Sequence, residues 1–83
     1  MTYSERAASL LYNHILDESE RLTIFPLSGI VEPHLCNADT KYRSLVVERG
    51  RFKLIYFIDD DNIVVAAVWN CRMNPDAMSD AIA

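Results

Sequence analysis

Positive charge in this 83-residue chain is concentrated in one short stretch. Five of its eight lysine and arginine residues fall within residues 41–53, where Glu48 is the single acid. Subtracting these from the totals of twelve acids and eight bases leaves eleven acids and three bases elsewhere, and the net charge is −4. Because local fields steer association, a basic stretch in an acidic protein predicts an anionic protein partner or a nucleic-acid target. The five bases are Lys41, Arg43, Arg49, Arg51 and Lys53.

Three cations are placed to act together. Arg51 and Lys53 lie on the same side of a predicted strand, and Arg72 ends a later strand that reaches the same zone. Such groups bind phosphates and carboxylates, so the three are candidates for contact with phosphate or an acidic partner. The alternative for Arg51 and Lys53 is solvated strand charge, with Glu48 opposite Arg51 as a cross-strand pair. For Arg72 the alternative is a carboxylate in the turn or the tail.

Structural roles explain the other polar candidates better. His34 and Cys36 are two potential metal ligands without a second pair at zinc spacing, so no metal site is expected. The acidic turn Asp59–Asn62 lacks the ligand spacing of a calcium loop. His14 has no nearby Ser or Cys that suggests a catalytic triad. Arg43 falls on the core face, where we expect it to bond helix carbonyls or an acid at the sheet margin.

Length and composition predict one small domain over residues 1–83. A content of 51% apolar and 24% charged residues is typical of a globular chain. Two cysteines, Cys36 and Cys71, are too few for a disulfide framework and are expected to be free thiols. The sequence has neither a secretory signal nor the roughly 20 consecutive apolar residues that span a bilayer. We therefore expect a cytoplasmic protein with no membrane partner and no cofactor.

Hydrophobic periodicity predicts an α+β fold, with an N-terminal helix packed on a three-stranded antiparallel meander and a short C-terminal tail. A capping box at Thr2–Glu5 opens the helix, which runs from about residue 4 to residue 23. Residues 30–40 are expected to be mostly loop. The predicted strands cover residues 42–48, 51–58 and 63–69, with Arg49 and Gly50 as a two-residue hairpin turn.

Strict alternation along these strands divides their residues between two faces. The face expected to pack on the helix carries Leu45, Val47, Phe52, Leu54, Tyr56, Ile58, Ile63, Val65, Ala67 and Trp69. The opposite face is expected to be exposed, apolar at one end and basic at the other, which is typical of a partner site. We predict that the partner-binding residues on this face are Arg51, Lys53, Ile55, Phe57, Val64 and Arg72.

Short motifs follow one another in an order similar to that of a known family. F-P-x-S-G follows the helix, Y-R-x-L and I-Y-x-I lie in the hairpin, and R-x-N-P follows the last strand. In this order and spacing the chain resembles the RelE/ParE superfamily, the toxins of bacterial type II toxin–antitoxin modules, over nearly its whole length. The stretches that carry the resemblance are Phe25–Gly29, Tyr42–Val47, Phe52–Ile58 and Val68–Pro75.

The resemblance implies a growth-inhibiting toxin, of the kind linked to plasmid stabilisation, that a cognate antitoxin neutralises. The ParE branch is associated with inhibition of DNA gyrase, and the RelE branch cleaves mRNA on the ribosome. If this chain were a RelE-like endonuclease, Lys53 and Arg72 would be the catalytic cations that stabilise the transition state. It has other residues where that branch carries strand lysines and a C-terminal tyrosine, so we expect a ParE-like protein that is not an enzyme. Those residues are Ser44, Val46 and Met78.

The chain departs from the family pattern at its start, where the usual first strand and first helix are lacking. An open sheet edge and uncovered apolar surface would result. An added antitoxin strand or a homodimer would cover them. The further alternative is an inactive, truncated homologue that only binds a partner.

Overall fold

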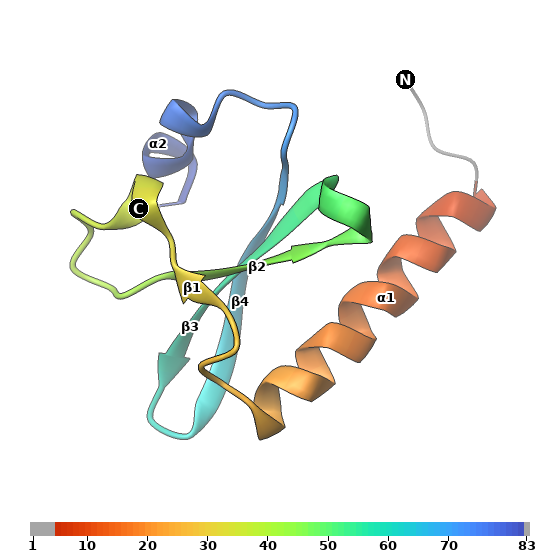
Figure 1. Cartoon of the computed structure of the whole chain (residues 1–83), viewed down its shortest axis with the longest axis horizontal. Coiled ribbons are helices and arrows are strands. Elements are labelled where there is room, and N and C mark those ends of the chain that lie inside the picture. The colour runs from red at the N-terminus through yellow and green to blue at the C-terminus, as the bar shows by residue number, and fades with distance from the viewer. Residues whose placement is uncertain (1–4, 83) are drawn as a thin grey trace.

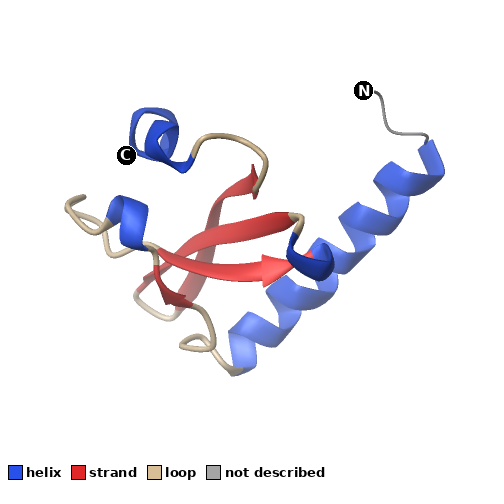
Figure 2. Ribbon diagram, turned by 45° about the horizontal axis from the view of Figure 1, so that its top comes forward, coloured by secondary structure: helices blue, strands red, loops and turns tan. Residues whose placement is uncertain are grey.

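The computed structural model describes residues 5–82 and has an α+β fold, as predicted. A 20-residue helix precedes a four-stranded antiparallel sheet, and a short second helix follows it (Figures 1 and 2). The strands lie side by side in chain order. Neither helix has the length and hydropathy that crossing a membrane requires, within the described residues. The elements are α1 (Glu5–Ile24), β1 (Ile30–Val31), β2 (Arg43–Val47), β3 (Phe52–Asp59), β4 (Asn62–Asn70) and α2 (Met78–Ile82), with 3-10 turns at Pro33–Leu35, Glu48–Gly50 and Pro75–Ala77.

Strand β1 corrects the prediction of a three-stranded sheet. Residues 30–40 were expected to be mostly loop, but Ile30 pairs with Ser44 and Val31 pairs with Arg43. Two residues are too few to show an alternating pattern, so the sequence gives no signal for this strand. Helix α1 agrees with its predicted span to within one residue at each end. The predicted capping box involves residues 2–4, which lie outside the described residues.

The β2–β3 hairpin has the predicted register, with Val47 opposite Phe52. Its turn is tight, because the Arg51 amide donates to the Glu48 carbonyl at 3.1 Å. Arg49 and Gly50 have φ values of 54° and 88°, as a type I′ hairpin turn requires. Glu48 is also left-handed, with a φ of 51°. Two consecutive non-glycine residues therefore adopt a conformation that L-amino acids rarely take.

A β-bulge in β4 overturns part of the predicted face assignment. Ile55 pairs with Ala67 whereas Tyr56 pairs with Val65, which leaves Ala66 as the extra residue. Alternation therefore shifts by one residue beyond Ala66. Ala67 and Trp69 were expected on the α1 face, but both pack on the opposite face.

The sheet consequently carries a small core on each face. The α1 face buries a cluster made of Leu22, Val47, Phe52, Leu54 and Tyr56. The opposite face buries Leu35, Ile55, Trp69 and Met78. Leu35 belongs to the first 3-10 turn and Met78 begins α2, so these two segments cover a face that was expected to be open.

Tyr56 ties the end of α1 to the sheet. Its hydroxyl donates to the Pro26 carbonyl at 2.8 Å and accepts from the Gly29 amide at 3.0 Å. A Cβ on Gly29 would lie 2.7 Å from this hydroxyl and 2.8 Å from the Ser44 carbonyl oxygen, so only glycine fits. Arg43 donates to the Gly29 carbonyl at 2.9 Å. Its role at the sheet margin is structural, as expected, but its partner is a carbonyl of the loop after α1 and not a helix carbonyl or an acid. The F-P-x-S-G and I-Y-x-I motifs thus meet in one buried contact.

Candidate anion-binding site

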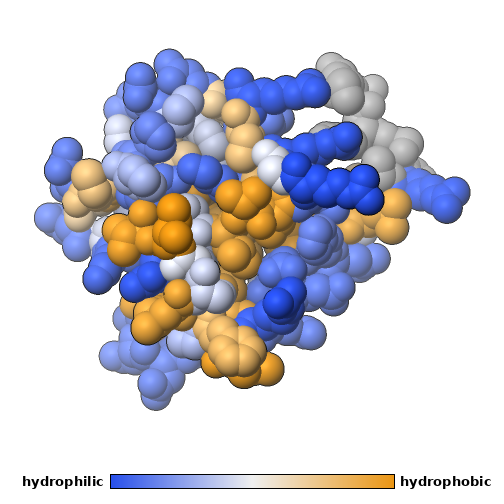
Figure 3. Space-filling model, viewed as in Figure 1, coloured by the Kyte–Doolittle hydropathy of each residue, from blue (hydrophilic) through white to orange (hydrophobic). Residues whose placement is uncertain are grey.

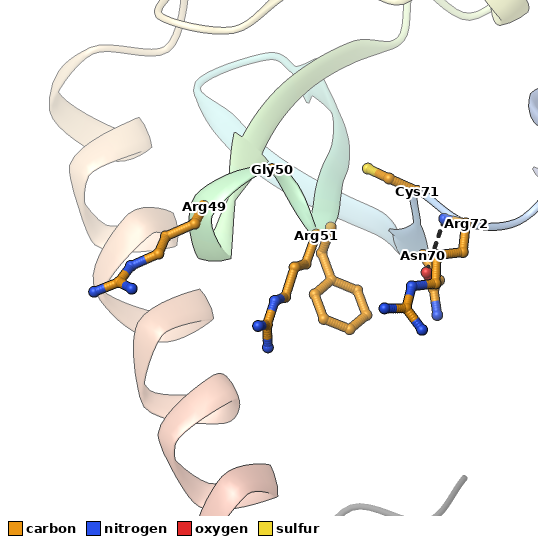
Figure 4. Close-up of a pocket in the computed structure, with 7 residues that line it drawn as sticks. Arg49, Gly50, Arg51, Asn70, Cys71 and Arg72 are labelled. Carbon is orange, nitrogen blue, oxygen red and sulfur yellow. Dashed lines mark hydrogen bonds between the residues drawn. The ribbon is translucent and has the colours of Figure 1, made fainter.

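The hairpin turn and the end of β4 enclose a pocket of about 460 Å³ at one end of the sheet. The pairing of Phe52 with Asn70 brings the two segments together. A hydrogen bond of 3.0 Å from the Cys71 amide to the Arg51 carbonyl continues this pairing beyond the strands. The lining residues are Arg49, Gly50, Arg51, Phe52, Asn70, Cys71 and Arg72 (Figure 4).

Three arginines dominate this pocket. Figure 4 shows that the side chains of Arg49, Arg51 and Arg72 extend to the same side of the hairpin. All three residues are exposed. Within residues 5–82, no carboxylate forms an ion pair with any of their guanidinium groups. We call Arg49, Arg51 and Arg72 the arginine cluster.

The turn conformation and a hydrogen bond from the Arg72 amide fix the backbone at two members of the arginine cluster. The left-handed turn fixes Arg49, and the Arg72 amide donates to Asn70 Oδ1 at 2.9 Å. The Glu48 carboxylate accepts a hydrogen bond from His14 Nδ1 of α1 at 2.7 Å. The alternative in which Glu48 neutralises Arg51 across the hairpin is therefore wrong, because Glu48 turns to the helix instead.

Chemically, this pocket suits binding rather than acid–base catalysis. Guanidinium groups hold carboxylates and phosphates through paired hydrogen bonds and keep their charge at every physiological pH. Enzymes use His, Asp, Glu, Lys, Tyr and Cys side chains as general acids and bases. Of these types, the described residues that line the pocket include Cys71 alone, an exposed thiol.

Lys53 lies in a different environment from the arginine cluster. Its Nζ is 2.7 Å from Glu32 Oε1, and the Glu32 side chain is fully buried. Burial alone would raise the pKa of Glu32. Hydrogen bonds from Lys53, the His34 amide and the Ser44 hydroxyl, with the charge of Lys53, outweigh burial and hold that pKa below its ordinary value. An ionised Glu32 therefore neutralises Lys53.

The apolar part of the predicted partner surface is mostly covered. Ile55 is completely buried, so its placement on an exposed face is wrong. Phe57 is half-buried and meets the Tyr42 ring edge-on, with centroids 5.7 Å apart. Val64 pairs with Phe57 and is also half-buried. Of the six predicted partner residues, the pocket brings together Arg51 and Arg72.

Sequence reasoning counted Arg49 in the basic stretch but did not place it in the site, and it missed Asn70 and Glu32. Arg49 carries a signal, because a type I′ turn at Arg49-Gly50 presents its first residue outward at the hairpin tip. Asn70 follows the last predicted strand and received no role. Glu32 gives no signal, since it lies in a segment without periodicity and meets Lys53 across 21 residues.

Potential metal ligands do not gather in the described part of the chain. No group of three or more His, Cys, Asp or Glu side chains there could hold a metal ion. Cys36 and Cys71 are exposed free thiols.

Comparison with known proteins does not assign this chain to a family. No protein-family model matches it, and the searches of curated proteins and of solved structures find no match.

Proposed function

We propose that this chain is a toxin-type interaction protein of the RelE/ParE kind, and that a cognate antitoxin binds it through the arginine cluster. The observation that carries this proposal is a pocket lined by three arginines that form no ion pair within residues 5–82, in a protein with twelve acids. Such a group of cations in an acidic protein is suited to bind an external anion.

An amphipathic acidic segment fits the surroundings of the pocket. The His14–Glu48 contact brings α1 beside the turn that carries Arg49. Leu10 lies one helical turn before His14 and is 62% exposed. Figure 3 shows further apolar side chains gathered over the middle of this view, between the sheet and α1. A partner segment with acids on one side and apolar residues on the other would contact both surfaces.

The target and location that we propose follow the ParE branch, namely DNA gyrase in the bacterial cytoplasm. No His, Asp, Glu, Lys or Tyr is among the described residues that line the pocket, and Glu32 neutralises Lys53. Both observations weigh against the alternative of a ribosome-dependent mRNA endonuclease that uses Lys53 and Arg72.

The test is tightly regulated expression in bacteria, with growth, labelled DNA synthesis and labelled protein synthesis followed together. We expect growth arrest in which DNA synthesis falls first. Translation falling first would instead indicate the mRNA endonuclease. Normal growth with soluble, folded protein would contradict the toxin proposal and leave a chain that only binds a partner.

A matched pair of variants connects this test to the pocket. The double variant Arg51→Glu, Arg72→Glu should lose capture by the antitoxin that neutralises the wild type. Lys41→Glu makes the same kind of charge reversal on an exposed loop residue outside the pocket and should leave capture unchanged. Equal capture by the double variant and the wild type would show that the arginine cluster is not part of the antitoxin-binding site.

A further inference from the structure

The outer edge of β4 is long and pairs with no strand of residues 5–82. This strand is the last in the sheet order and has nine residues, whereas the opposite edge is the two-residue strand β1. Natural edge strands usually carry charges or prolines that prevent pairing with another chain. Residues 63–69 of β4 contain neither. The bulge at Ala66 is the one irregularity, and it leaves four strand residues on each side.

Opposite charges flank this edge. The exposed acids Asp59, Asp60 and Asp61 end β3 and form the turn before β4, and the arginine cluster lies at the other end of β4. Nine strand residues separate the two ends by about 30 Å. Figure 1 shows this turn and the end of β4 at opposite ends of the strand.

If two copies paired their β4 edges antiparallel about a two-fold axis, an acidic turn would face an arginine cluster at each end of the interface. Because of the bulge, side chains on the same face are brought opposite one another when the pairing is centred between Ala66 and Ala67. This register sets Ile63 opposite Asn70 and Asp61 opposite Arg72. Each acidic turn then reaches the arginine cluster of the other copy. A parallel pairing would instead align like charges, acid with acid and arginine with arginine.

We propose that two copies of this chain form a dimer through the β4 edges, with the acidic turn of each copy in the arginine pocket of the other. A two-fold interface uses the same surface patch on both subunits, and this edge is complementary to itself in charge. The backbone groups on the outer side of β4 gain partners across the dimer. Because the pocket is also the antitoxin site of the proposed function, the dimer and the antitoxin complex exclude one another.

Two charge reversals test this pairing. Asp61→Arg is preferred to a change at Asp60, whose φ of 54° disfavours most side chains. The second variant is Arg72→Asp. In sedimentation experiments we expect the wild type to form a dimer. Each variant alone should dimerise about tenfold more weakly or worse, because like charges meet at both ends of the interface.

An equimolar mixture of the two variants distinguishes pairing from misfolding. Each end of the mixed dimer has one arginine facing one aspartate, so dimerisation should return to near the wild-type strength. A monomeric wild type, or a mixture no tighter than its components, would overturn the proposal. Asp39→Arg, an exposed change outside β4 and its flanking turn, is the matched control and should remain dimeric.

Val65→Lys tests the edge itself with both charged ends intact. Val65 is 40% exposed and lies next to the proposed centre. A lysine there should reduce dimerisation, and a dimer of unchanged strength would show that the interface does not lie at this edge.

Asp61→Arg keeps all three pocket arginines, so this monomeric variant should still capture the antitoxin. Loss of antitoxin capture with an intact wild-type dimer would count against the proposed function alone.

Discussion

Lys53 follows Arg49 and Arg51 of the arginine cluster closely in the sequence, yet the fold gives Lys53 an internal partner and leaves the cluster exposed. Lys53 is three-quarters buried and is held by a fully buried carboxylate at 2.7 Å. Arg49, Arg51 and Arg72 are exposed and have no carboxylate partner among the described residues. Proximity in sequence therefore does not make a shared site, because only the cations without an internal partner remain available to an external one.

Removal of the internal cation should cause the largest effect on stability. Lys53→Met leaves the Glu32 carboxylate buried without its main partner, which should lower the free energy of unfolding by about 3 kcal/mol. Urea denaturation measures this loss. Lys41→Met removes an exposed charge and should stay within about 0.5 kcal/mol of the wild type. A loss below about 1 kcal/mol for Lys53→Met would mean that the pair is not structural.

Reversal of the external cations should show the converse pattern. Arg51→Glu with Arg72→Glu should weaken binding of a fluorescent Glu- and Leu-rich amphipathic peptide by about thirtyfold, which corresponds to about 2 kcal/mol. Fluorescence anisotropy measures the affinity, with Lys41→Glu as the matched reversal. At protein concentrations too low for dimerisation, the free energy of unfolding should change little, since the arginine cluster has no internal ion pair to lose within the described residues. A large loss of stability would mean that the arginine cluster, like Lys53, helps to stabilise the fold.

Acid should remove part of the stabilisation by the internal pair. Glu32 has a pKa below its ordinary value of 4.5 in the folded protein, so the unfolded chain takes up protons first as the pH falls. The stabilisation is present above the unfolded pKa and disappears as the pH falls through the folded one. The stability difference between the wild type and Glu32→Gln should therefore shrink in acid, as measured by urea denaturation across this range. A difference that stays constant would show that the charge of Glu32 contributes nothing.

The smallest predicted change concerns backbone strain in the turn. Arg49→Gly should raise the free energy of unfolding by up to about 1 kcal/mol, since glycine adopts a positive φ without steric cost. The same variant removes one of three guanidinium groups and should weaken peptide binding by several-fold at most. Thermal denaturation and anisotropy follow the two quantities. A destabilised variant would indicate that the Arg49 side chain makes a structural contribution.

Sequence patterns predicted the α+β fold, the span of α1 and the register of the β2–β3 hairpin, because each depends on local periodicity or turn chemistry. They failed at Ala66, since residues 63–68 are uniformly apolar and no polar residue marks where alternation shifts. They also missed the Glu32–Lys53 pair, which depends on the path of a loop. The approach of Arg72 to Arg51 was predicted because both lie at strand ends.

The bulge at Ala66 gives β4 one residue more than its pairing with β3 requires. Deletion of one residue between Ala66 and Val68 would remove the bulge and leave Trp69 opposite Lys53, on the face that α2 covers. Insertion of one residue in the same stretch would need a larger bulge, or would turn the Trp69 indole to the α1 face. Among related chains, this stretch of β4 should therefore tolerate the loss of one residue better than the gain of one.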